Sequence, residues 1–227
     1  DKSLKAIGVL AQTRYDKLYG FDLDHLSNNI VPATSASEEL WELGLSDHKK
    51  FFVNKKSEVQ LMIEALELGK YESNEYSYHF LKEEKERVFQ RRKTWAKNGD
   101  VLICVNTGCS PTIPYKKLTV QAHRQLVQKL TKLPGIRIVL LGGPEDSKRN
   151  EEIAQGLPVI LSPSDKGLRD GMCSIAACDL IISGDSLGMH MAIACKKWVV
   201  AWFGPTCAHE IELYSRGEHI ITRAECS

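Results

Sequence analysis

Short apolar runs alternate with amphipathic stretches through the second half of the chain. The apolar runs have the length of strands and lie at residues 101–105, 137–141, 158–161, 180–183 and 198–202. Between them, apolar residues recur at helical spacing over residues 119–133, 146–155, 168–177 and 188–195. This alternation predicts an α/β fold with a right-handed, doubly wound, Rossmann-like parallel sheet.

The first part of the chain has a different pattern. Helical spacing occurs over residues 1–12, 37–44 and 57–68, whereas residues 19–23 and 28–32 predict short loops or strands. Residues 82–97 are highly charged and predict an exposed helix that bridges two lobes. We therefore place a domain boundary near Asn98 and expect a first domain over residues 1–97 and a second over residues 98–227.

Composition narrows the function classes. The chain has 227 residues, of which 43% are hydrophobic, enough for a packed core. Lys and Arg number 30 against 29 Asp and Glu, so the overall charge does not favour nucleic acid. Arg91, Arg92 and Lys93 predict a solvated helix face. No apolar run reaches membrane-spanning length and the first residues do not resemble a signal peptide, so we expect a cytoplasmic protein.

Cysteine usage points to a reducing compartment. The seven cysteines lie mostly inside apolar runs, so we expect most of them to be reduced core residues. No two are spaced as Cys-x-x-Cys, and we therefore expect no metal site in this chain.

The clearest chemical signal follows the apolar run at residues 180–183. Gly184, Asp185 and Ser186 end that run, and a helical stretch that contains Gly188 and His190 follows. In a parallel α/β sheet, such a turn presents backbone N–H groups and a positive helix end to a phosphate. Two simpler alternatives remain: Asp185 or Ser186 only caps the helix, and His190 is only a hydrogen-bonded packing residue.

Further candidates follow other apolar runs. Lys116 precedes the helix expected at residues 119–133, and its ammonium group is suited to neutralise a phosphate in a transition state. The adjacent Lys117 is an alternative for that contact. Thr107 and Gly108 are expected to form an anion-binding turn through their backbone N–H groups.

Two other turns offer weaker candidates. Glu145 follows Gly142, Gly143 and Pro144, and it either accepts hydrogen bonds from ribose hydroxyls or is a first-turn glutamate favoured by the helix dipole. Gly204 and Thr206 lie in a Gly-Pro-Thr turn that either contacts phosphate or is a turn only. No Gly-x-Gly-x-x-Gly fingerprint occurs at Gly142, which argues against an NAD-dependent dehydrogenase.

Four motifs in a fixed order resemble the C-terminal domain of glycosyltransferase family 9. They are Asn106-Thr-Gly-Cys followed by Lys116, Leu140-Leu-Gly-Gly-Pro-Glu145, Asp179-Leu-Ile-Ile-Ser-Gly-Asp-Ser-Leu-Gly-Met-His190, and Phe203-Gly-Pro-Thr206 followed by Glu210 and Tyr214. The resemblance covers nearly all of residues 99–223. That family includes the ADP-heptose:lipopolysaccharide heptosyltransferases, which have two facing Rossmann-like domains, the GT-B architecture.

The resemblance implies an inverting glycosyltransferase without a cofactor. Its donor would be a nucleotide-diphosphate sugar such as ADP-heptose, and its acceptor a lipopolysaccharide core or a related glycan. Lys116 and Asp185 would be the catalytic residues. The residues expected to bind the donor are Thr107, Gly108, Lys116, Glu145, Asp185, Ser186, Gly188, His190, Gly204 and Thr206.

The family comparison also carries expectations about the rest of the enzyme. It implies an acidic catalytic base upstream of Asp1 and further helices after Ser227, so we interpret this sequence as an internal portion of a longer protein. Family members often have Thr-Gly after the aspartate, whereas Ser186 and Leu187 follow it here. Peripheral contact with the inner membrane is compatible with a lipid-linked acceptor, although no amphipathic anchor is evident.

Two alternative functions remain open. One is another GT-B enzyme with a UDP-linked donor, and the other is a non-catalytic protein that binds nucleotide sugars or glycans. Binding of UDP in preference to ADP would favour the first alternative, and an upstream Gly-Asp loop in the full gene would count against the second.

Overall fold

The computed structural model describes residues 3–97 and 99–222. It divides into two compact units, each described separately below. One unit contains the chain up to Asn74 together with His209–Glu212, and the other contains Glu75–Ala208 and the chain from Leu213 onward.

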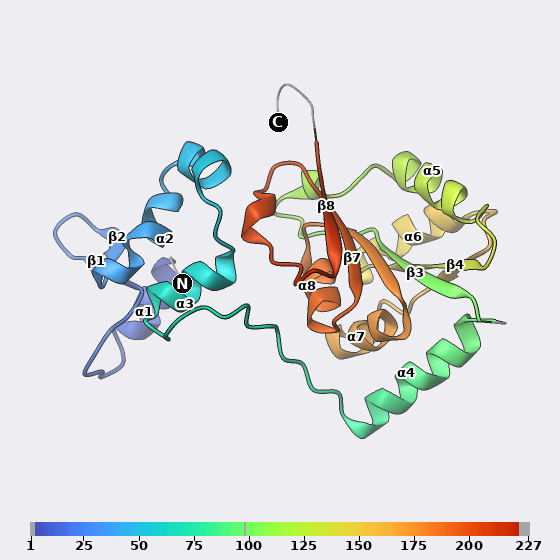
Figure 1. The fold of residues 1–227 in the computed structure, drawn as a ribbon, viewed down its shortest axis with the longest axis horizontal. Coiled ribbons are helices and arrows are strands. Elements are labelled where there is room, and N and C mark those ends of the chain that lie inside the picture. The colour runs from blue at the N-terminus through green and yellow to red at the C-terminus, as the bar shows by residue number, and fades with distance from the viewer. Residues whose placement is uncertain (1–2, 98, 223–227) are drawn as a thin grey trace. The chain divides into compact units, whose positions relative to one another are not determined.

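The second unit is built on a six-stranded parallel sheet (Figure 1). Its strands are β3 (Val101–Asn106), β4 (Ile136–Leu141), β5 (Val159–Leu161), β6 (Leu180–Gly184), β7 (Trp198–Phe203) and β8 (Gly217–Ile221). They lie in the order β5-β4-β3-β6-β7-β8, which is the order of a doubly wound dinucleotide-binding sheet. The predicted parallel α/β sheet is confirmed.

The sequence pattern missed one strand. β8 pairs with β7 at the edge of the sheet, and most of its residues are exposed. An edge strand with little burial has no continuous apolar run, so its pattern gives no strand signal.

Four helices cover the sheet. They are α5 (Val120–Leu130), α6 (Ser147–Ala154), α7 (Leu168–Ala177) and α8 (Leu187–Ala194), all close to their predicted positions. Figure 1 shows α5 and α6 on one face and α7 and α8 on the other. Val127 of α5 and Ile153 of α6 are fully buried against strand residues such as Val105 and Leu140. The core therefore lies between the helices and a sheet that is apolar on both faces.

The strand order creates a crevice at the carboxyl ends of β3 and β6. The chain passes from β3 to β4 on one side, and it later returns to place β6 on the other side of β3. The connections that follow β3 and β6 therefore leave the sheet in opposite directions at their carboxyl ends. In open parallel sheets, ligands bind at this switch point.

The charged helix α4 (Lys82–Trp95) packs on α7 in the second unit (Figure 1). The prediction of a solvated Arg91 is wrong, because only 11% of its side chain is exposed and it contacts Asp170 at 2.6 Å. Arg91 also donates to the hydroxyl of Ser174 at 2.9 Å. The partner Asp170 lies in α7, far from residues 82–97 in the sequence. The charge pattern of residues 82–97 could therefore not reveal this ion pair.

The helix α4 belongs to the second compact unit, so the boundary between the units lies before it. The compact units divide between Asn74 and Glu75 rather than after residue 97. The assignment of residues 1–97 to an acceptor side and 98–227 to a donor side concerns function, and it stays a prediction.

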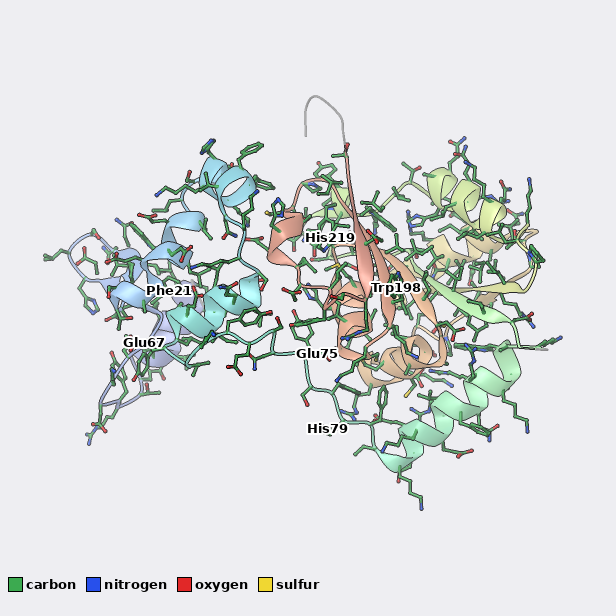
Figure 2. All side chains as sticks on the ribbon, in the orientation of Figure 1. Phe21, Glu67, Glu75, His79, Trp198 and His219 are labelled. Carbon is green, nitrogen blue, oxygen red and sulfur yellow. The ribbon has the colours of Figure 1, made fainter. Side chains whose placement is uncertain are left out.

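The first unit combines helices with an antiparallel pair of strands. Its elements are α1 (Leu4–Leu10), β1 (Phe21–Asp24), β2 (Asn29–Pro32), α2 (Glu38–Leu43), a π-helical turn (Lys49–Val53) and α3 (Glu58–Ala65), with a short 3-10 helix at Ser35–Ser37. Phe21, labelled in Figure 2, is buried with Leu40, Leu43, Leu61 and Ala65. The Ser57 side chain caps α3 by accepting the Gln60 N–H.

Two further observations concern the whole described chain. None of the helices in residues 3–97 and 99–222 combines the length and apolarity needed to cross a membrane. The six cysteines in these residues are free thiols, and five of them are buried. Cys226 lies outside the described residues.

We expect Arg91→Met to lower the free energy of unfolding of the second unit by about 3 kcal/mol. The substitution leaves the Asp170 carboxylate, which is 4% exposed, with Arg87 at 3.4 Å as its remaining cationic partner. Urea unfolding followed by circular dichroism measures the change. Arg92→Met is the control, because Arg92 and Asp179 are 37% and 41% exposed, and its loss should stay below about 1 kcal/mol. Equal losses in the two variants would contradict the prediction.

Candidate functional site

A cavity of about 550 Å³ opens at the carboxyl edge of the sheet in the second unit. Its walls come from the loops after β3, β4, β5 and β6, so it occupies the switch point between β3 and β6. This volume lies within the usual range for pockets that bind small molecules. The site is therefore located where both the topology and the surface shape favour a ligand.

An ion pair forms part of the cavity wall. Lys116 Nζ is 2.7 Å from Asp185 Oδ2, and their side chains are 19% and 13% exposed. His190 Nε2 lies 3.9 Å from the other carboxylate oxygen of Asp185. Lys116 ends the turn Pro114–Lys116, whereas Asp185 follows β6 and His190 lies in α8. The fold thus joins residues that are far apart in sequence.

The N-terminus of α8 faces the same cavity. Ser186 precedes the helix in an extended conformation, and its side chain makes no capping hydrogen bond within the described residues. Its hydroxyl instead accepts a hydrogen bond from Asn106 Nδ2 at 2.8 Å. The side-chain cap considered for Ser186 is therefore not formed. An N-terminus without a side-chain cap presents backbone donors and a positive dipole end to an anion.

Asn106 holds the turn after β6 against the loop after β3. Its amide also donates to the Gly108 carbonyl at 3.1 Å and to the Ser183 hydroxyl at 3.0 Å. A Cβ atom on Gly188 would lie 2.7 Å from Asn106 Cγ. Glycine at position 188 therefore lets the start of α8 approach β3 closely.

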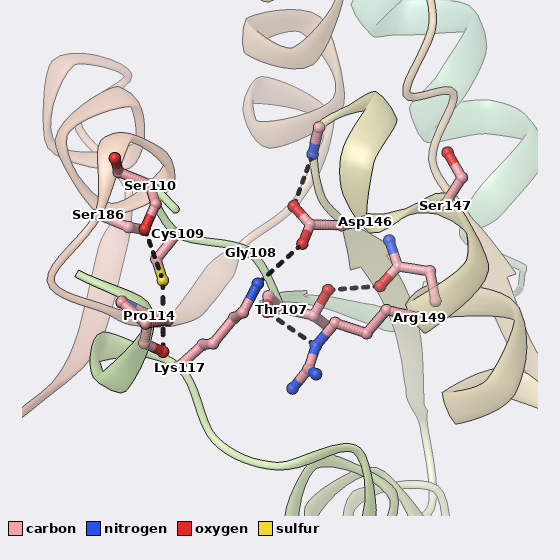
Figure 3. Close-up of polar contacts among 12 residues, drawn as sticks. Thr107, Gly108, Cys109, Ser110, Pro114, Lys117, Asp146, Ser147, Arg149 and Ser186 are labelled. Carbon is pink, nitrogen blue, oxygen red and sulfur yellow. Dashed lines mark hydrogen bonds and ion pairs between the residues drawn. The ribbon is translucent and has the colours of Figure 1, made fainter. Parts of the chain in front are cut away.

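A second ion pair lies at the other side of the loop after β3 (Figure 3). Lys117 Nζ is 3.5 Å from Asp146 Oδ1, and the Asp146 side chain is only 3% exposed. The Gly143 N–H donates to the same carboxylate at 3.1 Å. A Cβ atom on Gly108 would lie 2.0 Å from Asp146 Oδ2. Asp146 is thus a fixed anchor for Lys117 and for the loop that contains Gly108.

The structure brings most of the predicted site residues together. Those that line the cavity are Gly108, Lys116, Glu145, Asp185, Ser186, Gly188 and His190. Thr107, Gly204 and Thr206 are not among its lining residues. The Thr107 hydroxyl lies within hydrogen-bonding distance of the Leu141 carbonyl, at 3.2 Å, and of the Asn150 side chain, so it links the start of the loop after β3 to the end of β4 and to α6.

Other site residues were missed by the sequence reasoning. Asn106 and Asp146 each adjoin a predicted residue. Asn106 also ends an apolar run, which was an available signal, whereas Asp146 lies five residues after Leu141, the last residue of its run. Tyr76 had no such signal, because it precedes α4 outside every motif. Its ring stacks on His190 with the centroids 6.4 Å apart and an interplanar angle of 28°. Only the folded chain shows this contact.

A buried histidine lies beneath the loop that contains Lys116. His123 of α5 is completely buried, and its Nδ1 is 2.9 Å from Arg149 Nη2. Burial and the positive charge of Arg149 lower the pKa of His123 to about 4. Arg149 also donates to the Thr107 carbonyl at 3.2 Å, as Figure 3 shows. His123 is therefore neutral at physiological pH and belongs to the support of the site.

Across the described ranges 3–97 and 99–222, no group of three or more His, Cys, Asp or Glu side chains is arranged to hold a metal ion.

We expect the second unit to lose stability as the pH falls from about 6.5 to about 4. An unfolded His123 protonates near pH 6.5, but the folded one resists protonation until about pH 4. The loss should approach 3 kcal/mol, since each pKa unit corresponds to about 1.4 kcal/mol. Urea unfolding at several pH values measures it. In His123→Gln, whose amide still accepts from Arg149, this part of the pH dependence should vanish. If the free energy of unfolding of His123→Gln fell with decreasing pH as steeply as that of the wild type, the prediction would be contradicted.

Comparisons with known proteins agree with this fold. A sequence model of glycosyltransferase family 9 (heptosyltransferase) matches residues 49–227. No curated protein matches the chain in sequence.

Several solved structures share the fold. A family 9 glycosyltransferase from Veillonella parvula DSM 2008 has a TM-score of 0.64 and 20% identity, over 76% of this chain and 51% of that protein. E. coli heptosyltransferase WaaC, solved with ADP, has a TM-score of 0.55 and 19% identity, over 74% and 51%. E. coli ADP-heptose lipopolysaccharide heptosyltransferase II has a TM-score of 0.53 and 22% identity, over 63% and 44%.

This chain spans about half the length of those structures, and the likeness at such identity shows the fold. The expected Rossmann-like, GT-B type fold class is confirmed. The family model covers well over half of the chain, and the motifs occur in the expected order on the expected fold. The chain therefore belongs to glycosyltransferase family 9.

Proposed function

We propose that this chain binds the donor of a heptosyltransferase, which transfers a heptose from ADP-heptose to a lipopolysaccharide core or a related glycan. The observation that supports this most directly is the convergence of Lys116, Asp185 and the N-terminus of α8 on one cavity. A diphosphate needs a cation and oriented backbone donors, and both are present there. Family membership supports the proposed reaction class.

In this proposal Lys116 binds the diphosphate and stabilises it as it leaves. The acceptor hydroxyl oxygen attacks the anomeric carbon from the face opposite the diphosphate. The bond from that carbon to the β-phosphate oxygen breaks, and its electron pair stays on the departing ADP. The hydroxyl proton passes to a base on the acceptor side, and the configuration inverts. The Lys116 ammonium offsets the charge that develops on ADP, where a preorganised cation is most effective.

Asp185 has a different role in the proposal. A carboxylate next to a phosphate costs electrostatic energy, so it is better suited to the donor sugar and to its cationic neighbours. Its two oxygens face Lys116 at 2.7 Å and His190 at 3.9 Å. We assign it to orienting these two side chains and to accepting hydrogen bonds from sugar hydroxyls. Glu145 lies exposed on the cavity wall, and we assign it to the ribose.

A second candidate function is nucleotide-sugar binding without transfer. It is favoured by Leu187, the first residue of α8, whose apolar side chain lines the cavity and is 56% exposed. Such a side chain restricts the space beside the phosphate-binding turn. Incubation of a protein that contains both the donor side and the acceptor side with ADP-heptose and a lipopolysaccharide-core acceptor distinguishes the two functions. Glycosylated product supports transfer, whereas donor binding without product supports the second candidate.

Acceptor and location are part of the same proposal. A lipopolysaccharide-core acceptor is anchored in lipid, so the protein would work in the cytoplasm with peripheral contact to the inner membrane.

Calorimetric titration with ADP, UDP and NAD tests donor recognition. We expect ADP to bind more tightly than UDP, and NAD to bind more weakly than either. Tighter binding of UDP would support a different GT-B donor. Binding of NAD alone, or the failure of both ADP and UDP to bind, would overturn the proposal.

We expect Lys116→Ala to weaken ADP binding by about 10- to 100-fold, the usual effect of losing a hydrogen bond to a charged group. Lys129→Ala is the matched control, because Lys129 is an exposed lysine near the other end of α5. Its substitution should leave ADP affinity unchanged. Equal affinities for Lys116→Ala and the wild type would show that Lys116 does not contact the diphosphate.

A further inference from the structure

The loop that brings Lys116 to the cavity depends on distant side chains for its position. Residues 107–119 join β3 to α5, and the turn Pro114–Lys116 is the regular element in this fully described loop. A long loop needs partners elsewhere for its backbone groups, because it forms few hydrogen bonds within itself. The contacts of the Lys116 backbone therefore decide where its side chain lies.

Trp202 supplies such a contact from a strand that lies two positions away from β3 in the sheet. It lies on β7, and its indole Nε1 donates to the Lys116 carbonyl at 3.0 Å. The register places Trp202 beside Gly184 of β6. A Cβ atom on Gly184 would lie 2.3 Å from the Lys116 carbonyl oxygen and 2.8 Å from Trp202 Nε1. The indole and the carbonyl can meet only because residue 184 has no side chain.

The indole is itself held in place. The ring of His123 meets it edge-on, with the centroids 5.8 Å apart and an interplanar angle of 66°. The Arg149 guanidinium contacts His123 and also donates to the Leu118 carbonyl, two residues after Lys116. These contacts fix the loop on both sides of Lys117.

We propose that Trp202 is a positioning residue for Lys116. Its indole N–H fixes the Lys116 carbonyl, so the ammonium group is held 2.7 Å from Asp185 and directed into the cavity. Without this hydrogen bond the lysine must lose more conformational freedom to reach the same point. The further step, that the positioned ammonium meets a donor phosphate, rests on the proposed donor-binding function.

The first test needs no nucleotide. We compare the acetylation rate of Lys116 in the ligand-free chain by peptide mass spectrometry, with Lys129 as the internal reference. Trp202→Phe should raise the rate about fivefold, the population change expected for losing one hydrogen bond. Trp198→Phe is the matched control, since Trp198 lies on the same strand and is 45% exposed (Figure 2). Equal rates in the two variants would overturn the proposal.

Gly184→Ala provides a second variant that acts on the same carbonyl. Its new methyl group would occupy the space in which the indole and the Lys116 carbonyl meet. We expect it to raise Lys116 acetylation in the same direction as Trp202→Phe. A normal rate in this variant, with the fold intact by circular dichroism, would contradict the proposed role of that contact.

The second test separates positioning from a general structural effect. Trp202→Phe should weaken ADP binding about fivefold and leave adenosine binding unchanged, because adenosine has no phosphate for Lys116. In the Lys116→Ala background the Trp202 substitution should have no further effect on ADP. The proposal would be overturned if Trp202→Phe weakened the binding of ADP and of adenosine equally, or if it still weakened ADP binding in the Lys116→Ala background. If the wild type does not bind ADP, the donor-binding function fails, and the acetylation rates still decide the role of Trp202.

Discussion

The adjacency of β3 and β6 is the constraint on which the rest of the site depends. Parallel strands need crossover connections, and the order β5-β4-β3-β6-β7-β8 makes two of these connections diverge at the ends of β3 and β6. The divergence leaves an opening that the two loops line with polar side chains. Lys116 from one loop and Asp185 from the other meet there across 69 residues of sequence.

Close backbone approach is the second requirement, and glycine residues provide it. Gly108, Gly184 and Gly188 each lie where a Cβ atom would collide with a side chain or carbonyl of the neighbouring loop. The loops after β3, β4 and β6 are therefore closely packed around the cavity. Packing at this density transmits small displacements, so residues outside the cavity such as Trp202 influence the groups inside it.

Buried charges in the second unit are matched rather than avoided. Arg91 pairs with Asp170 between α4 and α7, and Lys117 pairs with Asp146 beside the cavity. Asp170 and Asp146 are nearly inaccessible, so the loss of Arg91 or Lys117 would leave a buried carboxylate with weaker compensation of its charge. His123 has no such partner, because its neighbour Arg149 is also positively charged. Burial and the charge of Arg149 lower the pKa of His123 and keep its side chain neutral.

Sequence pattern alone determined the class of the fold and most of its elements, because buried strands and amphipathic helices impose periodicities that are local. It also placed Lys116, Asp185 and Ser186 in the connections that follow strands, where parallel sheets bind ligands, and His190 at the start of the helix after Ser186. It missed β8, whose exposed residues have no strand pattern, and it mistook Arg91 for a solvated residue.

Only the tertiary structure decided which of these residues meet. It joined Lys116 to Asp185, brought Asp146 and Asn106 into the site, and placed Thr107 beneath the cavity rather than in its lining. It also revealed the contacts of Tyr76 with His190 and of Trp202 with Lys116. The physical reason is that hydrogen bonds, ion pairs and ring contacts depend on distances in space, whereas hydrophobic periodicity records only which face of each element is buried.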